Sequence, residues 1–227
     1  MTICIIPARS GSKRIKNKNI KKINNRAIIS YTIKTAIKSK LFSRVIVSTD
    51  SKRIANIAIS YGAEVPFFRS NKLSDDHTST KDVIIDCIKN ISSEKTPYHF
   101  CIYPTASLLE VADLKKAFNK IKKKNFDFLI ATSEFNYSPL RAFKILNREV
   151  IKFNSEKYLY SRSQDIPRLI HDSGTFYIYK TKSLLVQKKS LPSKTTFYML
   201  ERLKSLDINY PEDLKFAKYL HKYFKKK

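Results

Sequence analysis

The sequence predicts an α/β fold, in which helices cover both faces of a mostly parallel β-sheet. Short runs of β-branched and aromatic residues alternate with segments whose apolar residues recur at helical spacing. The first such run, Ile3 to Ile6, leads directly into a basic loop, and open α/β sheets bind ligands at the carboxyl ends of their strands. At 227 residues the chain is long enough for one sizeable core, so we expect a single domain over residues 1–227.

The first half of the chain alternates regularly between strand and helix. Each expected strand is rich in Ile, Val or Phe, and each expected helix carries apolar residues three or four positions apart. Gly62 stops one helix and Pro104 ends one strand. The expected strands are Thr2–Ala8, Arg44–Thr49, His99–Tyr103 and Phe126–Thr132. The expected helices are Ile28–Lys40, Lys52–Tyr61, Thr80–Ile91 and Val111–Lys123.

The alternation stops after Thr132. Residues 135–170 contain aromatic residues, Pro139, Pro167 and short strand-like pieces but no clear helix. We expect a β-rich excursion from the main sheet there, which caps a site or pairs subunits. Regular elements then resume as strand Phe176–Tyr179, helix Ser183–Lys188, strand Thr195–Leu200 and helix Pro211–Phe224.

Composition limits the classes of protein. The formal net charge is +26, but the lysines are scattered over the polar sides of nearly every expected helix rather than gathered on one face. We interpret this charge as biased residue usage, which leaves a nucleic-acid-binding protein as a remote alternative. No window approaches the length of a membrane span and no signal-peptide core is present, so we expect a cytoplasmic protein that does not engage a membrane. The cysteines lack CxxC spacing and are expected to be buried free thiols: Cys4, Cys87 and Cys101.

The basic loop after the first strand has the chemistry of a phosphate site. It reads IPARSGSKRIKNKN over residues 6–19, and its small residues around Gly11 let backbone N–H groups approach an anion. Long cations reach the outer oxygens of such an anion: Arg9, Lys13, Arg14, Lys16 and Lys18. The glycines that a Walker A loop or a dinucleotide fingerprint requires are absent. A basic surface turn is the alternative interpretation, and the position at a strand end favours the phosphate site.

Two further segments combine polar groups of functional types. Residues 160–174, YSRSQDIPRLIHDSG, mix arginine with Gln, His and Asp, which suits a polyhydroxylated acid, although a polar capping loop would look similar. Residues 206–214, LDINYPEDL, place Asp207 between a strand and a helix. A carboxylate there suits Mg²⁺, which takes few protein oxygens and relies on substrate phosphates for others, and helix capping is the alternative role.

Five segments, taken together and in order, resemble the cytidylyltransferases that activate nine-carbon acidic sugars. They are IPARSGSKRIKNKN, VSTDS, FRSNKLSDDHTST, YPTASLLEVADL and LDINYPEDL, and YSRSQD followed by HDSGTFYIY is most similar to the members that use pseudaminic acid. The resemblance implies a Rossmann-like, three-layer homodimer that uses Mg²⁺ to join CTP to the anomeric hydroxyl of a nonulosonic acid and releases pyrophosphate. Pseudaminic acid is the expected sugar, and legionaminic and N-acetylneuraminic acids are the alternatives.

By position, the resemblance also implies roles for individual residues. The nucleotide-binding set is Ala8, Arg9, Ser12, Lys13, Asn19, Arg69, Thr80, Pro104 and Thr105. The sugar-binding set is Tyr103, Arg141, Arg162, Gln164, His171 and Asp172. The catalytic set, which positions the substrates and neutralises charge, is Arg9, Lys13, Lys18 and Asp207. The magnesium ligands are Asp207 and Asn209.

Three positions depart from the family pattern. Ser10 stands where relatives usually have a second glycine, and Lys16 stands where they have proline. Asn209 stands where they have the second aspartate of an Asp-x-Asp pair. An amide oxygen can ligate Mg²⁺ but brings no charge, so we expect Asn209 to lower the affinity for the metal.

Overall fold

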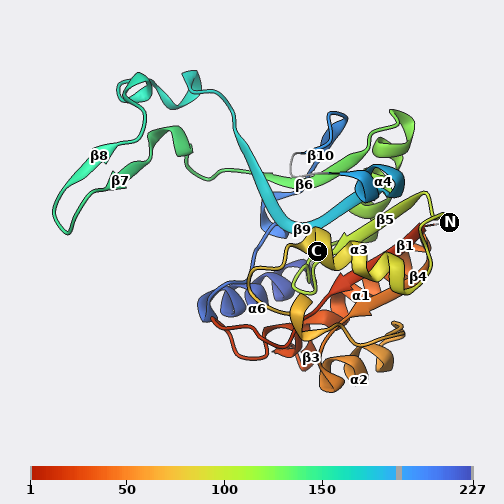
Figure 1. Ribbon diagram of the computed structural model, residues 1–227. Coiled ribbons are helices and arrows are strands. Elements are labelled where there is room, and N and C mark those ends of the chain that lie inside the picture. The colour runs from red at the N-terminus through yellow and green to blue at the C-terminus, as the bar shows by residue number, and fades with distance from the viewer. Residues whose placement is uncertain (1, 188–190, 226–227) are drawn as a thin grey trace.

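A six-stranded β-sheet forms the centre of the computed structural model, which describes residues 2–187 and 191–225 (Figure 1). The strand order is β10-β6-β9-β5-β1-β4. β1 (Thr2–Pro7) pairs in parallel with β4 (Phe42–Ser48) and with β5 (Tyr98–Ile102), and β10 (Thr195–Met199) pairs in parallel with β6 (Phe128–Glu134). Only β9 (Ile170–Lys180), inserted between β5 and β6, is antiparallel among the six strands of the described chain. The predicted mostly parallel α/β sheet is therefore confirmed.

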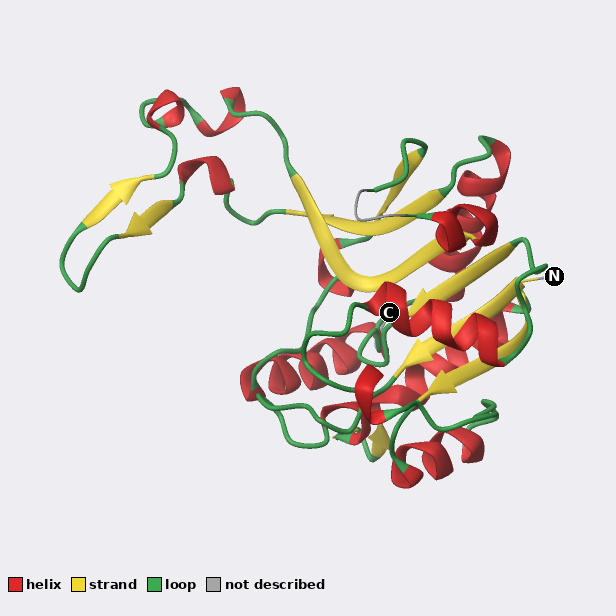
Figure 2. Cartoon of the chain, viewed as in Figure 1, coloured by secondary structure: helices red, strands yellow, loops and turns green. Residues whose placement is uncertain are grey.

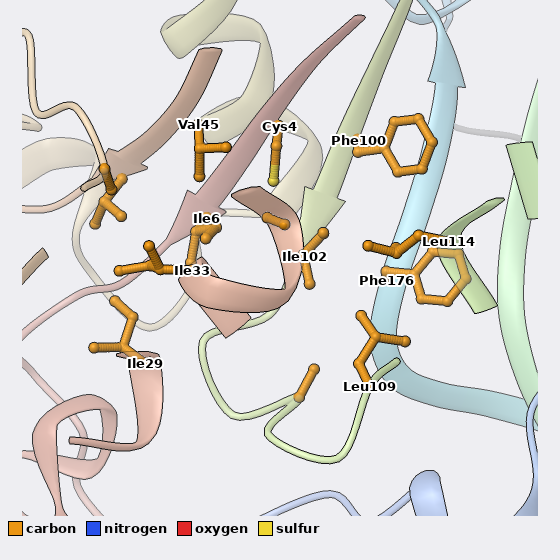
Figure 3. Packing of buried hydrophobic residues seen from close by; sticks show 14 of the residues in the cluster. Cys4, Ile6, Ile29, Ile33, Val45, Phe100, Ile102, Leu109, Leu114 and Phe176 are labelled. Atoms are coloured by element: carbon orange, nitrogen blue, oxygen red, sulfur yellow. The ribbon is translucent and has the colours of Figure 1, made fainter. Parts of the chain in front are cut away.

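Helices cover both faces of this sheet because alternate residues of each strand point to opposite sides. Cys4 and Ile6 of β1 pack toward one face, under α1 (Ile28–Ser39), α2 (Lys52–Ser60) and α4 (Val111–Lys123), as Figure 3 shows for part of this cluster. Ile3 and Ile5 pack toward the other face, with α3 (Thr80–Asn90) and α5 (Thr181–Val186). The sheet and the helices on its two faces therefore form the three layers that the alternating sequence pattern predicts.

The last helix, α6 (Pro211–Lys225), packs beside the loop that follows β1. Ile208 and Ala217 join Ile15, Ile23 and Ile28 in a third, smaller apolar cluster. This cluster fixes the carboxyl edge of the sheet against the C-terminal part of the described chain. No helix of the described residues is long and apolar enough to cross a membrane.

Residues 135–169 form an arm that extends away from the sheet (Figures 1 and 2). The arm contains a small hairpin of β7 (Phe143–Ile145) and β8 (Ile151–Phe153) and short 3₁₀ turns, but no α-helix. Its two ends are joined by the pairing of Glu134 in β6 with Ile170 in β9. The expected β-rich excursion is thus present, and it is the most prominent departure from a compact shape.

Several element boundaries differ from the sequence-based expectation. β9 begins at Ile170, six residues before the expected strand, because Ser173 and Thr175 are buried polar residues that hydrogen-bond each other, and Ser173 also donates to the carbonyl of Ala131. A second hairpin, β2 (Lys22–Ile23) with β3 (Arg26–Ala27), was not expected. α5 ends at Val186, and Lys188, where we expected its end, lies outside the described residues.

Candidate active site

The basic loop after β1 lies at the carboxyl edge of the sheet, where it is held by β4 and by the residues that follow β4. Ala8 donates its backbone N–H to Ser48 at 2.9 Å. The backbone N–H and hydroxyl of Ser10 both donate to the carboxylate of Asp50, at 2.8 and 2.6 Å. This double contact fixes the turn of the loop at Ser10. Asn19 is buried and donates from its side chain to the carbonyl of Arg9, which shapes the other end of the loop.

A cavity of about 470 Å³, which we call the strand-end pocket, opens beside this loop. It is bounded by the loop itself, by residues 69–83 and by the segment after β5. Most of the predicted nucleotide-binding residues line it, together with Lys18, Tyr103 and Asn209. The predicted residues that it brings together are Arg9, Ser12, Lys13, Lys18, Asn19, Arg69, Thr80, Tyr103, Pro104, Thr105 and Asn209. Ala8 and Asp207 are not among its lining residues within the described chain.

Arg69 is the most deeply buried cation of the strand-end pocket, with 5% of its surface exposed. Its backbone N–H donates to Thr49 at 2.8 Å and its Nε donates to the hydroxyl of Ser74 at 3.2 Å. Its Nη2 has no hydrogen-bond partner among the described residues. Burial lowers the pKa of Arg69, although an arginine remains charged at neutral pH. The side chain therefore offers an unused, desolvated donor to a ligand.

Lys18 connects the basic loop to the segment before α6. Its ammonium donates to the carbonyl of Ile208 at 2.8 Å. Burial lowers the pKa of Lys18, and the nearby carboxylate of Asp207 acts in the opposite direction. The same segment caps α6, because the carboxylate of Asp213 accepts the backbone N–H groups of Asn209 and Tyr210 at 2.8 Å each. The capping role that we considered for Asp207 thus belongs to Asp213.

Asp207 and Asn209 have the donor types that Mg²⁺ accepts, a carboxylate and an amide. The amide nitrogen of Asn209 donates to Oδ2 of Asp207 at 2.5 Å, so the two side chains lie next to each other. No group of three His, Cys, Asp or Glu residues gathers around a common point in the described chain. This set fits a metal that takes one or two protein oxygens and completes its shell with phosphates and water.

Two acidic residues that we did not predict also line the strand-end pocket. The carboxylate of Asp76 forms ion pairs with Arg9, at 2.7 Å from Nη2, and with Lys13. The carbonyl of Asp75 accepts from Nη1 of Arg9 at 2.5 Å. Both residues lie in the FRSNKLSDDHTST segment that carries part of the family resemblance, but the sequence alone does not show which cations they meet.

A chain of hydroxyl groups runs from the strand-end pocket toward Asp172. The hydroxyls of Thr80 and Tyr103 are 2.8 Å apart, and the rings of Tyr103 and Tyr177 meet edge to face with centroids 5.7 Å apart. The hydroxyl of Tyr177 donates to Oδ2 of Asp172 at 2.5 Å, and the N–H of Gly174 donates to Oδ1 at 2.9 Å. Burial raises the pKa of Tyr103 to about 12, so its hydroxyl keeps its proton at neutral pH. Tyr177 was missed from sequence because it sits in a strand that looks entirely structural.

The remaining predicted sugar-binding residues lie on or near the arm. The ring of His171 lies 4.8 Å from that of Phe135 at the arm's base, and its Nδ1 approaches the carbonyl of Asp172 at 2.8 Å. Arg141 lines a second cavity, of about 740 Å³, inside the arm. Arg162 and Gln164 belong to the arm but line neither of these two cavities. Within one chain, the structure does not bring these three arm residues to the strand-end pocket.

Comparison with known proteins gives a consistent result. Residues 3–226 match the family described as Cytidylyltransferase. The chain is 38% identical over 222 residues to a pseudaminic acid cytidylyltransferase of Campylobacter jejuni serotype O:2, which covers 97% of this chain and 96% of the relative. It is 33% identical to a CMP-N,N'-diacetyllegionaminic acid synthase of the same organism, and the match covers 96% of this chain and 94% of the relative. In fold it is similar to a solved CMP:2-keto-3-deoxy-manno-octonic acid synthetase complexed with CTP, at a TM-score of 0.73, 15% identity and 98% coverage of both chains.

Proposed function

The chain belongs to the cytidylyltransferase family, and from this premise we propose that it transfers CMP from CTP to the anomeric hydroxyl of pseudaminic acid. The products are CMP-pseudaminate and pyrophosphate. The observation that carries the proposal is the strand-end pocket, where Arg9, Lys13, Lys18 and Arg69 converge at the carboxyl edge of the sheet. Such a cluster suits a triphosphate, and the 38% identical relative supports the choice of sugar.

The reaction places specific demands on these residues. The sugar hydroxyl attacks the α-phosphorus in line as pyrophosphate leaves, so the protein chiefly positions the two substrates and neutralises charge. Arg9 and Lys13 are exposed enough to reach the β- and γ-phosphates, whereas Arg69 is buried, and we assign Arg69 together with Thr80 to the nucleoside. We assign Lys18, which is held at the carbonyl of Ile208, to the α-phosphate.

We assign the metal to Asp207 and Asn209. These two residues would hold Mg²⁺, which would supply charge neutralisation at the phosphates and make the attacking hydroxyl more acidic. The carboxylate of Asp207 is near enough to Lys18 to favour the charged form of the lysine, which is itself held by the carbonyl of Ile208. The neutral amide of Asn209 reduces the negative charge of the site relative to a pair of aspartates, and we expect a higher magnesium requirement for that reason.

The sugar would lie beyond Tyr103, facing Asp172 and His171. The hydroxyl of Tyr177 and the N–H of Gly174 hold the carboxylate of Asp172 in one orientation, ready to accept hydrogen bonds from hydroxyl or amide groups of the sugar. We further propose a homodimer in which the arm carries Arg141, Arg162 and Gln164 to the sugar site of the second copy. Support comes from the position of these residues on an extended arm with exposed apolar side chains at Phe143 and Ile145.

A substrate panel tests the proposed reaction. Purified protein is incubated with CTP and Mg²⁺ and with one of pseudaminate, legionaminate, N-acetylneuraminate or Kdo, and pyrophosphate release is measured. We expect release with pseudaminate at a kcat/KM at least about tenfold above the other sugars, since one well-placed hydrogen-bonding group contributes roughly 1–3 kcal/mol of discrimination. Faster release with legionaminate or N-acetylneuraminate would transfer the assignment to that sugar. If no sugar leads to release of pyrophosphate, the proposed enzymatic activity is refuted.

The proposed location is the cytoplasm. Cys4, Cys87 and Cys101 are free and buried, and burial raises the pKa of each thiol. Unpaired cysteines of this kind suit a reducing compartment, because structural disulfides are typical of oxidising ones.

A further inference from the structure

Two cations of the strand-end pocket, Arg9 and Lys13, share one carboxylate of the chain itself. Asp76 lies between Arg9 and Lys13 and contacts both. Arg9 and Lys13 are the pair that the proposed function assigns to the outer phosphates of CTP, so the inference below rests on that function. A carboxylate and a phosphate oxygen compete for the same guanidinium and ammonium donors, since both are anionic acceptors of similar geometry.

The local structure presents Asp76 to these cations and uses its neighbour for a different purpose. The carboxylate of Asp75 accepts from the backbone N–H groups of His77 and Thr78 at 3.0 and 2.7 Å, and from the hydroxyl of Thr78 at 2.7 Å. Asp75 therefore fixes the turn. The carboxylate of Asp76 instead reaches out of the turn into the strand-end pocket, where hydrogen bonds from Lys13 and then Arg9 lower its pKa and keep it charged at neutral pH.

The ion pairs of Asp76 with Arg9 and Lys13 are accessible to solvent. The side chains of Arg9 and Asp76 are 34% and 33% exposed, and that of Lys13 is 81% exposed. Ion pairs this accessible are weak, because water and salt screen them and long side chains lose freedom in forming them. A triphosphate or pyrophosphate carries several negative charges and displaces a single carboxylate from such a pair.

We propose that Asp76 is an internal competitor for the phosphate cations, and that it lowers the affinity of the strand-end pocket for pyrophosphate. Without a phosphate ligand, Asp76 forms ion pairs with Arg9 and Lys13. These ion pairs break when CTP binds and form again as pyrophosphate departs. The return of Asp76 favours release of the product. The effect is selective, because a ligand such as CMP has no β- or γ-phosphate to compete with Asp76.

Isothermal titration of the Asp76→Asn variant with inorganic pyrophosphate, CTP and CMP, each in the presence of Mg²⁺, tests this role. We expect the affinities for pyrophosphate and CTP to rise about two- to tenfold, the range that corresponds to losing one or two exposed ion pairs, and the affinity for CMP to stay unchanged. The Glu94→Gln variant removes the same charge from an exposed loop residue outside the pocket, and it controls for net charge. Weaker or unchanged pyrophosphate binding by Asp76→Asn would overturn the proposal, because Asp76 would then position the cations rather than compete for them.

A double-mutant cycle separates competition from general repulsion. In a Lys13→Met background, Asp76 has one cation fewer to occupy, so the gain from Asp76→Asn shrinks if the proposal is right. A gain of full size in that background, or an equal gain for CMP, would show long-range repulsion instead and refute it. These titrations measure ligand binding alone, so their outcome does not depend on whether the protein converts a sugar. If the substrate panel gives no product while Asp76→Asn still tightens pyrophosphate binding, the proposed reaction fails and the competitor role stands.

Discussion

Arg69 shows how one residue of the strand-end pocket is prepared for a ligand by the fold. Its Nη2 is buried and lacks a partner among the described residues, which costs a folded protein about 1–3 kcal/mol. Its Nε and its backbone are nevertheless held by Ser74 and Thr49, so the guanidinium cannot turn away toward water. A bound nucleotide that accepts from Nη2 removes this cost. The free energy lost by leaving Nη2 without a partner is regained when the nucleotide binds, and it adds to the affinity for the nucleotide.

The Arg69→Met variant tests this interpretation. We expect CTP affinity to fall by about five- to a hundredfold, the equivalent of 1–3 kcal/mol, and the melting temperature of the ligand-free protein to stay level or rise. Calorimetric titration with CTP and thermal unfolding without ligand give the two values. Arg44→Met, which removes an arginine paired with Glu64 elsewhere on β4, is the matched control and should leave CTP affinity intact. A large loss of stability with unchanged CTP affinity would show that Arg69 is only structural.

At the scale of elements, the sequence predicts what local patterns determine and misses what depends on distant partners. The alternation of strands and helices, the arm and the basic loop follow from spacing and composition. β9 was expected to start at Phe176, because Ser173 and Thr175 break the apolar pattern and are satisfied only by each other and by Ala131 on β6. Asp76 was missed for a similar reason, since its partners Arg9 and Lys13 lie more than sixty positions earlier in the chain.

The β2–β3 hairpin is a case in which a signal was present and was not used. Asn24 and Asn25 form its turn with φ values of 48° and 64°. Asparagine tolerates this left-handed region better than other residues with a side chain, and consecutive left-handed residues are typical of tight two-residue hairpin turns. The pair Asn-Asn between Lys22-Ile23 and Arg26-Ala27 therefore predicts the hairpin turn.

Gly174 gives a prediction at the scale of its strand. It lies within β9 at φ +60°, and a Cβ there would stand 3.6 Å from Cγ of Asp207. Gly174→Ala should lower the stability of the protein by roughly 1–2 kcal/mol, because a side chain disfavours this backbone conformation. Gly11→Ala is the matched control, since nothing lies within 4 Å of its Cβ position, and it should leave stability unchanged. Urea unfolding of both variants measures the difference, and equal stabilities would contradict the prediction.

At the scale of the whole molecule, a packed body and an extended arm have different surfaces. The body has apolar clusters on both faces of its sheet, whereas the hairpin of the arm leaves Phe143, Ile145 and Ile151 more than half exposed. Exposed apolar residues gathered on a projecting element are typical of an interface between chains. The proposed homodimer would cover this surface and would also bring the arginines of the arm to a second body.

The Ile145→Asp variant tests the dimer without removing the arm. A charge at this 80% exposed position should not disturb folding, but it should weaken an apolar interface and shift the protein toward monomer in sedimentation experiments. We expect CTP binding to persist and kcat/KM for the sugar to fall at least about tenfold, because sugar contacts supplied by the second copy are lost. Ile59→Asp, at an exposed position of α2, is the control. An Ile145→Asp protein with the sedimentation and activity of the parent would contradict the proposed dimer.

His99 makes global stability depend on pH. It is fully buried in β5, with ring nitrogens 3.0 Å from the hydroxyl of Ser93 and 2.8 Å from that of Thr181, and burial lowers its pKa to about 4. An unfolded histidine has a pKa near 6.5, so unfolding takes up a proton between pH 6.5 and 4. Stability should therefore fall as the pH drops through this window, by up to about 3 kcal/mol below pH 4.

Chemical unfolding of the parent, His99→Gln and His77→Gln proteins between pH 7.5 and 4 checks this expectation. The His99→Gln protein should show a shallower loss of stability with falling pH, whereas His77→Gln, which alters an exposed histidine, should retain the slope of the parent. Identical slopes in all three proteins would show that His99 does not control the acid response.

The anchoring of the arm has a consequence for how such proteins diversify. Residues 135–169 leave and re-enter the sheet through a single cross-strand pair, Glu134 with Ile170, whose Cα atoms lie only about 5 Å apart, as in any antiparallel ladder. Replacing everything beyond that pair should leave the strands, the hydrophobic clusters and the basic loop in their places, because none of the arm's described residues belongs to those clusters. We therefore expect the arm to be exchangeable between relatives. If the arm carries residues of the sugar site, as proposed, chimeras that keep one body and carry arms from relatives should change recognition of the acceptor while the residues of the strand-end pocket stay constant.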